Sequence, residues 1–214
     1  MADIFREVDE EVRKQKAGEL WRRYGTVVVA AAVLIVLGMM AYKGWVYFQS
    51  LEREKLSEAF DAAVRLAEAG DSAQASNAFA ALAEPDGDGY PLLAALEQAN
   101  LLAEAGDVQA ASAIWDEVAA SEAAGPGFRG IATLLSVLHQ LESGDLQTLR
   151  ARLEPMASEG QTFRSGALEL MAALALREGR KEEAADLYRA IADDISAPSG
   201  LRARATQMLA ALGE

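Results

Sequence analysis

An apolar stretch near the N-terminus constrains this chain more than any other feature. No charged residue occurs from Thr26 to Tyr42, and the stretch extends from Tyr24 through Phe48 if the Lys43 ammonium reaches the water interface. At ~1.5 Å rise per residue, about twenty helical residues cover the roughly 30 Å hydrocarbon core of a bilayer. We therefore predict a single transmembrane helix over residues 25–48.

Aromatic residues flank this stretch on both sides, as expected for rings that settle at the two headgroup levels. The predicted membrane-interface anchors are Trp21, Tyr24, Tyr42, Trp45 and Tyr47. A cleaved signal peptide is the competing interpretation, but it would need an unusually long basic region and a small-x-small cleavage pattern, which does not follow the apolar run. A buried helix of a soluble protein is a further alternative, and it leaves the flanking aromatic residues unexplained.

The distribution of positive charge predicts the direction of insertion. The N-terminal side carries Arg13, Lys14, Lys16, Arg22 and Arg23, whereas Lys43, Arg53 and Lys55 are the only basic residues just beyond the stretch. Basic flanks stay in the cytosol, so residues 1–24 are expected there and residues 49–214 on the far side, in the periplasm of a Gram-negative bacterium.

The predicted cytosolic segment, residues 1–24, has an amphipathic pattern. Ile4, Phe5, Val8 and Val12 share one face of a short helix that is otherwise rich in charge. This face either docks on a partner or on the membrane surface, or it belongs to a loosely structured flank, because isolated short helices are marginal in water.

Composition predicts that the remainder is all-helical and acidic. Alanine dominates, aromatic residues are few, and the β-branched residues cluster in the apolar stretch instead of recurring in short runs. Residues 49–214 carry 13 Lys/Arg against 27 Asp/Glu. Such a domain repels phosphate backbones, so we expect protein partners and no nucleic acid. Cysteine is absent, which excludes disulfides, thiolate metal sites and cysteine nucleophiles.

A turn signal recurs through the acidic part. Gly70, Gly106, Gly144 and Gly179 are spaced by 36, 38 and 35 residues, and each lies between two helical patterns. Left-handed glycine caps that join antiparallel helices would produce this arrangement. Five positions after each glycine comes a smaller residue, and four positions later a large one, on the same helix face: Ala75 and Phe79, Ala111 and Trp115, Leu149 and Leu153, Ala184 and Tyr188.

These residues resemble the tetratricopeptide repeat, a helical hairpin of about 34 residues. In its register the first helices place Ala63, Ala99 and Ala172 at the small position, with Val137 departing in the third copy. Pro155 predicts a short or kinked second helix in that copy. We expect an α-solenoid of about four hairpins, closed by a capping helix from Ser199 to Leu212.

No residue pattern supports catalysis or a cofactor. His139 is the only histidine, and it lies among leucines in a predicted helix, as a packed or groove-lining side chain would. Gly125, Gly127 and Gly130 match G-x-G-x-x-G, but no strand is predicted before them, so they mark a loop between repeats.

A calcium loop of the EF-hand type is also not supported. Asp86, Asp88 and Glu97 occupy loop positions 1, 3 and 12, but Tyr90 and Pro91 stand at positions 5 and 6, where the motif needs an oxygen ligand and a glycine. We predict a non-enzymatic chain with no metal, no cofactor and no small-molecule substrate.

The layout resembles the YfgM-like ancillary subunit family of the SecYEG translocon, most clearly over residues 3–12, 21–25 and 44–48. That resemblance implies an inner-membrane protein with a periplasmic repeat domain beside the translocation channel. Its implied partners are translocon subunits, a membrane-anchored periplasmic chaperone and emerging polypeptides. A periplasmic scaffold for envelope assembly or cell division is the alternative function.

The tetratricopeptide register also predicts a partner groove along positions 2, 5, 9 and 12 of the first helices. The groove residues are Phe60, Val64, Leu93, Leu96, Asn100, Leu134, Leu138, Leu141 and Leu176. This lining is apolar and lacks the basic residues that clamp a C-terminal carboxylate. It either accepts an apolar segment of a partner or is filled by the chain's own helices.

Overall fold

The computed structural model describes residues 2–213, with the side chains of residues 21–213 except Val28 and Ala32. In that part of the chain, helices are joined by turns and loops, and there is no strand. The predicted amphipathic face of Ile4, Phe5, Val8 and Val12 lies outside the described side chains. The helices are α1 (Ala2–Glu68), α2 (Ser72–Ala80), α3 (Tyr90–Glu104), α4 (Val108–Ala120), α5 (Gly125–His139), α6 (Leu146–Leu153), the 3₁₀ helix η1 (Glu154–Met156), α7 (Arg164–Arg177), α8 (Lys181–Ala192) and α9 (Ser199–Leu212).

The chain divides into two units, residues 1–55 and residues 56–214. Helix α1 runs through this division, and its helical backbone shows no break near the predicted boundaries at residues 24 and 48. The domain boundaries of the membrane segment therefore stay predictions from the sequence.

In the first unit, the middle of α1 is apolar on every side. Five consecutive residues from Val33 to Leu37 each expose more than half of their side-chain surface. Because successive helical residues point about 100° apart, five in a row cover the whole circumference. The described chain has one helix that is long and apolar enough to cross a membrane, by length and composition.

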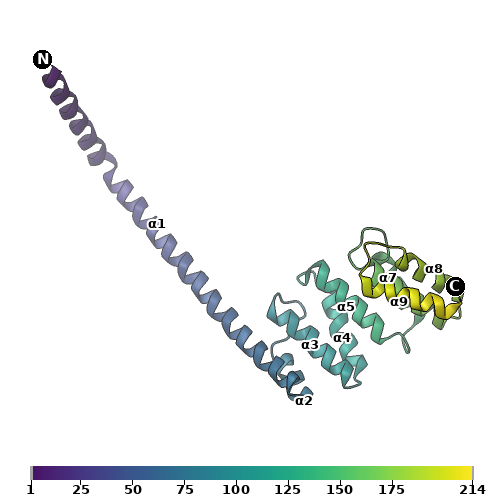
Figure 1. The fold of residues 1–214 in the computed structure, drawn as a ribbon. Coiled ribbons are helices and arrows are strands. Elements are labelled where there is room, and N and C mark those ends of the chain that lie inside the picture. Colours follow the sequence, from purple (N-terminus) through teal and green to yellow (C-terminus); the bar gives the residue numbers. More distant parts are fainter. Residues whose placement is uncertain (1, 214) are drawn as a thin grey trace. The chain divides into compact units, whose positions relative to one another are not determined.

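The second unit is a stack of helical hairpins (Figure 1), and the predicted repeat positions form its core. The end of α1 pairs with α2, α3 with α4, α5 with α6, and α7 with α8. The small positions of the first helices, Ala63, Ala99, Val137 and Ala172, are all fully buried. The smaller and large residues predicted for the second helices are also buried: Ala75, Phe79, Ala111, Trp115, Leu149, Leu153, Ala184 and Tyr188.

Three of the four repeat glycines are left-handed helix caps, as predicted. Gly70, Gly106 and Gly179 have φ values of 81°, 89° and 78°. Each donates its N–H to the carbonyl three residues back, and the following residue donates to the carbonyl five residues back, as Asp107 does to Leu102 at 2.9 Å. These paired bonds form the Schellman motif, which satisfies the last carbonyls of the first helix.

The left-handed conformation predicted for Gly144 was wrong, because Gly144 does not have a positive φ. Its N–H bonds to the Gln140 carbonyl at 2.8 Å. A Cβ atom on Gly144 would lie 2.9 Å from that same oxygen and 2.9 Å from Leu149 Cδ1. Glycine occurs here because the turn packs closely on α5 and α6, and not because the backbone needs a left-handed residue.

The third copy has a short second helix, as Pro155 predicted. Helix α6 ends at Leu153, and Pro155 lies in η1. Two arginines of α6 bind neighbouring hairpins: Arg150 pairs with Glu178 and Glu183, at 3.1 and 2.7 Å. Arg152 pairs with Asp116 of α4 and donates to the fully buried Ser136 of α5.

Helix α9 caps the stack with the predicted bounds. Ala205 is buried, and Leu201, Met208, Leu209 and Leu212 pack on the cluster formed by α7 and α8. Arg204 of α9 makes two bonds, of 2.9 and 3.0 Å, to the carboxylate of Glu169 on α7. The last hairpin is therefore covered on the side where a further repeat would stack.

Candidate partner-binding surface

The predicted groove residues differ widely in their exposure. Phe60 packs on Phe79 and Tyr90, with ring centroids 5.3 Å from each, and Val64 joins the same cluster. Leu96 is only 8% exposed and belongs to the core around Trp115. These side chains help to hold the hairpins together.

Most of the remaining groove residues are half-buried. Leu93 and Asn100 of α3 are in this class. Leu134 and Leu141 pack on the cluster that α5 to α7 share, and Leu176 packs on the cluster beneath α9.

Leu138 is the groove residue with a large exposed apolar side chain, and it has two neighbours on α5 that the sequence prediction missed. Leu138 is 47% exposed, Ile131 39% and Phe128 37%. At 100° per residue these three side chains fall within roughly 80° of arc, so they share one side of the helix. The i, i+7 spacing of Ile131 and Leu138 was the sequence signal that could have revealed this α5 apolar face, the name used below for Phe128, Ile131 and Leu138.

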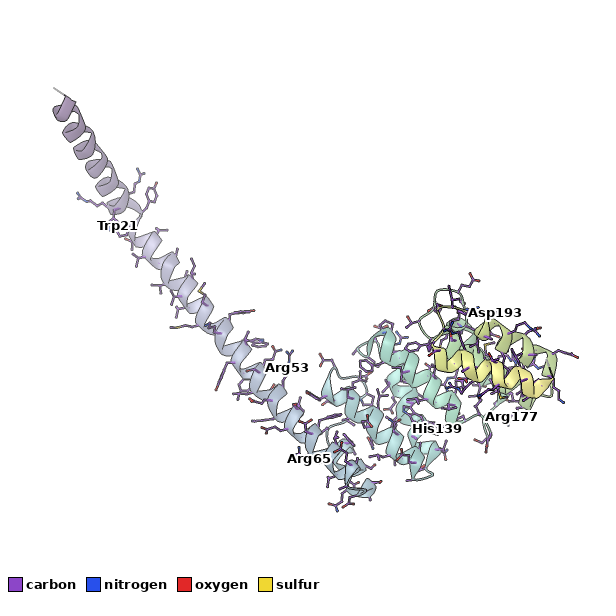
Figure 2. All side chains as sticks on the ribbon, viewed as in Figure 1. Trp21, Arg53, Arg65, His139, Arg177 and Asp193 are labelled. Atoms are coloured by element: carbon purple, nitrogen blue, oxygen red, sulfur yellow. The ribbon has the colours of Figure 1, made fainter. Side chains whose placement is uncertain are left out.

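A hollow of about 500 Å³ lies beside the C-terminal end of this face. Its lining includes Glu68 of α1, Glu97, Asn100 and Glu104 of α3, and His139 at the end of α5. We call these five residues the acidic hollow. His139 is the last residue of α5 and follows Leu138, so the end of the helix that carries the apolar face reaches the hollow, although Leu138 itself does not line it. Figure 2 shows His139 at this end of α5.

His139 is held by stacking. Its ring lies on the buried Trp115 indole with centroids 4.8 Å apart and an angle of 29° between the planes. The imidazole itself is exposed toward the hollow. His139 therefore packs against Trp115 on one side and lines the acidic hollow on the other.

The residues that match metal-site and nucleotide-site patterns in the sequence lie in a loop and in helices of the repeat domain: Asp86 and Asp88 precede α3, Glu97 lies in α3, and Gly125, Gly127 and Gly130 lie in α5. Among the described residues, no group of three or more His, Asp or Glu side chains is placed to hold a metal ion. The loop predicted for Gly125, Gly127 and Gly130 was wrong, because α5 begins at Gly125 and contains all three. A Cβ atom on Gly130 would come within 2.4 Å of the Phe163 ring. The close approach of this ring accounts for Gly130 without a nucleotide.

The predicted membrane-interface anchors are all exposed on α1. Trp21 and Tyr24 lie at one end of the apolar stretch, and Tyr42, Trp45 and Tyr47 lie at the other. The Arg23 guanidinium lies 5.8 Å from the centre of the Tyr24 ring. At ~1.5 Å per residue, Tyr24 and Tyr42 are about 27 Å apart along the helix, close to the thickness of a hydrocarbon core.

Comparison with known proteins identifies the family. The sequence matches the family model of a tetratricopeptide repeat-like domain over residues 19–213. Comparisons with curated proteins and with solved structures gave no significant match. The matched range includes the apolar stretch of α1 as well as every hairpin. The chain therefore belongs to the tetratricopeptide repeat-like domain family, whose members are typically non-enzymatic scaffolds for protein–protein interaction.

Proposed function

We propose that this chain is a membrane-anchored interaction module of the bacterial envelope. In this proposal residues 25–48 cross the inner membrane, residues 1–24 remain in the cytosol, and the repeat domain works in the periplasm. The supporting observation is that one chain carries both an all-round exposed apolar helix with aromatic residues at each end and a repeat stack with an exposed apolar face. Apolar surface of either kind is costly in water and implies a covering partner, lipid in one case and protein in the other.

The finer proposal is that the chain is an accessory subunit of the Sec translocon that links emerging polypeptides to a membrane-anchored chaperone. The anchor concentrates the repeat domain near the membrane surface, so individually weak contacts become effective. Emerging polypeptides expose apolar segments, and the α5 apolar face offers an apolar surface of matching character. No step of this function needs catalysis, a metal or a cofactor.

Photo-crosslinking in intact membranes tests this function. A photoreactive residue at Leu138 reports on the α5 apolar face, and one at Trp45 reports on neighbours of the membrane segment. Glu182, which is exposed on α8, provides the matched control position. We expect Leu138 to crosslink to a periplasmic chaperone or an emerging polypeptide, Trp45 to crosslink to translocon subunits, and Glu182 to crosslink to neither.

The same crosslinking experiment distinguishes the translocon function from the alternative function as an envelope scaffold. If both positions crosslink to peptidoglycan synthases or division proteins and to no translocon subunit, the chain is an envelope scaffold. If Leu138 gives no protein crosslink under conditions where Trp45 does, the interaction function assigned to the α5 apolar face is wrong.

A further inference from the structure

The end of α5 that carries Leu138 lies near three carboxylates that, within the described part of the chain, form no ion pair with a basic side chain. Glu68, Glu97 and Glu104 all line the acidic hollow, and all three are exposed. Among the described residues, no ion pair joins any of them to Lys, Arg or His. The C-terminal hairpins differ, because several of their carboxylates form ion pairs, such as Arg204–Glu169 and Arg164–Asp194.

The whole N-terminal half of the repeat domain has the same imbalance. Residues 56–128 contain one basic residue, Arg65, against 13 Asp/Glu, whereas residues 129–214 contain 10 Lys/Arg against 12 Asp/Glu. The three carboxylates of the hollow therefore belong to the half of the domain that carries nearly all of its net negative charge. Charges of one sign, concentrated in a concave surface, raise the local concentration of oppositely charged ligands and speed their association.

From these observations we infer that the repeat domain recognises a polypeptide segment in which Lys or Arg side chains adjoin large apolar ones. The apolar side chains contact Phe128, Ile131 and Leu138, and the cations enter the acidic hollow between α1, α3 and the end of α5. This inference rests on the proposed interaction function and specifies the partner. An acidic segment, or one ending in a free carboxylate with no basic residue, is excluded by repulsion from Glu68, Glu97 and Glu104.

The two parts of this surface have different roles. The apolar contacts supply most of the binding free energy, because the α5 side chains lose water when a partner covers them. The carboxylates lie at an exposed rim, where charge mainly sets partner choice and association rate and is screened by salt. Binding should therefore weaken as ionic strength rises, but it should not vanish.

The test uses the full chain in nanodiscs of zwitterionic phosphatidylcholine, with empty nanodiscs as the blank. Two fluorescent synthetic peptides of equal length carry the same Leu and Phe residues, and they differ only in having Lys or Glu at the polar positions. We expect the Lys peptide to bind and the Glu peptide to bind at least about tenfold more weakly, a difference typical of complementary against like charge.

Matched substitutions locate the binding site. Leu138→Ser should raise the dissociation constant of the Lys peptide about tenfold, since truncation of a contact at the centre of an interface typically has this effect. The double change Glu97→Gln, Glu104→Gln should raise it a few-fold and flatten its dependence on salt. Ile195→Ser, at a loop residue that is 91% exposed, and Glu182→Gln should leave it unchanged.

The opposite results would overturn the inference. They are equal binding of the two peptides, no binding of the Lys peptide, or Lys-peptide binding that Leu138→Ser leaves intact. The peptide pair and the salt titration use the unaltered chain, so they decide the matter even if a variant misfolds. If the chain binds both peptides alike but still crosslinks to protein partners from Leu138, the proposed interaction function stands and the preference for basic segments is wrong. If it neither prefers the Lys peptide nor crosslinks to protein from Leu138, both the function and the preference are wrong.

Discussion

At the scale of single residues, the same residue type serves different physical purposes in different copies of the repeat. Gly106 is open around its Cα, and it is needed because its φ is positive. Gly144 has an ordinary φ, but it is needed because backbone and side-chain atoms crowd its Cα. A glycine at the equivalent position of each copy therefore does not mean that each copy needs glycine for the same physical reason.

Substitution by Ala and by Asn should distinguish these two glycines. At Gly106, Ala should lower the free energy of unfolding by about 1–2 kcal/mol, the cost of a left-handed backbone for a residue with a Cβ. Asn tolerates that conformation and should cost less than Ala. At Gly144 the larger Asn should cost at least as much as Ala, because the difficulty there is space. Chemical denaturation of the four variants measures both orders, and an Asn advantage at Gly144 would refute the explanation by crowding.

Leu96 and Leu138 should respond very differently to the same change. Leu96→Glu buries a charge in the core around Trp115 and should destabilise the repeat domain by roughly 3 kcal/mol or more. Leu138→Glu changes a half-exposed side chain and should cost less than about 1 kcal/mol. Thermal unfolding followed by circular dichroism compares the variants. Equal destabilisation would mean that the α5 apolar face is structural.

At the scale of elements, α6 is a short helix that is held in the stack by bonds to neighbouring helices. It is 8 residues long, and its two arginines reach α4, α5, α8 and the turn after α7. Arg177 of α7 donates to the carbonyls of Leu141 and Gly144 in the turn that leads into α6. These bonds to neighbouring hairpins offset the small apolar face that a short helix buries.

The N-cap of α6 predicts a specific dependence on pH. Asp145 accepts hydrogen bonds from the Thr148 hydroxyl and backbone N–H, at 2.6 and 2.8 Å, and these bonds lower the pKa of its carboxyl below the ordinary value of 3.8. A lowered folded-state pKa contributes stability that is fully present above the unfolded pKa and is lost as pH falls through the folded one. Asp145→Asn should therefore lower the urea midpoint at pH 7, and its deficit should shrink toward pH 3. Glu182→Gln is the control. A deficit that stays constant or grows in acid would contradict this role for Asp145.

At the scale of the whole molecule, the sequence predicted the features that repeat or that depend on one segment alone. The buried pairs such as Ala111 and Trp115 followed from helical spacing, and α9 followed from Pro198 and the need to cover the last repeat. The groove was harder to predict, because the register assigns both Leu96 and Leu138 to groove positions, whereas the packing of neighbouring hairpins buries Leu96 and leaves Leu138 exposed. The arginine bonds of α6 were not predictable for the same reason, since they join residues 16 to 36 positions apart, as Arg152 with Ser136 and with Asp116 shows.

The most direct test of the membrane-anchored arrangement is site-specific labelling with a thiol reagent that cannot cross the inner membrane. The chain has no cysteine, so a single Cys at Asp9 or at Glu122 is the only reactive thiol in each variant. In cells with a permeabilised outer membrane, Glu122→Cys should be labelled fully and Asp9→Cys only after lysis. Labelling of Asp9→Cys in intact cells with protection of Glu122→Cys would reverse the topology, and a protein recovered in the soluble fraction would remove the membrane anchor altogether.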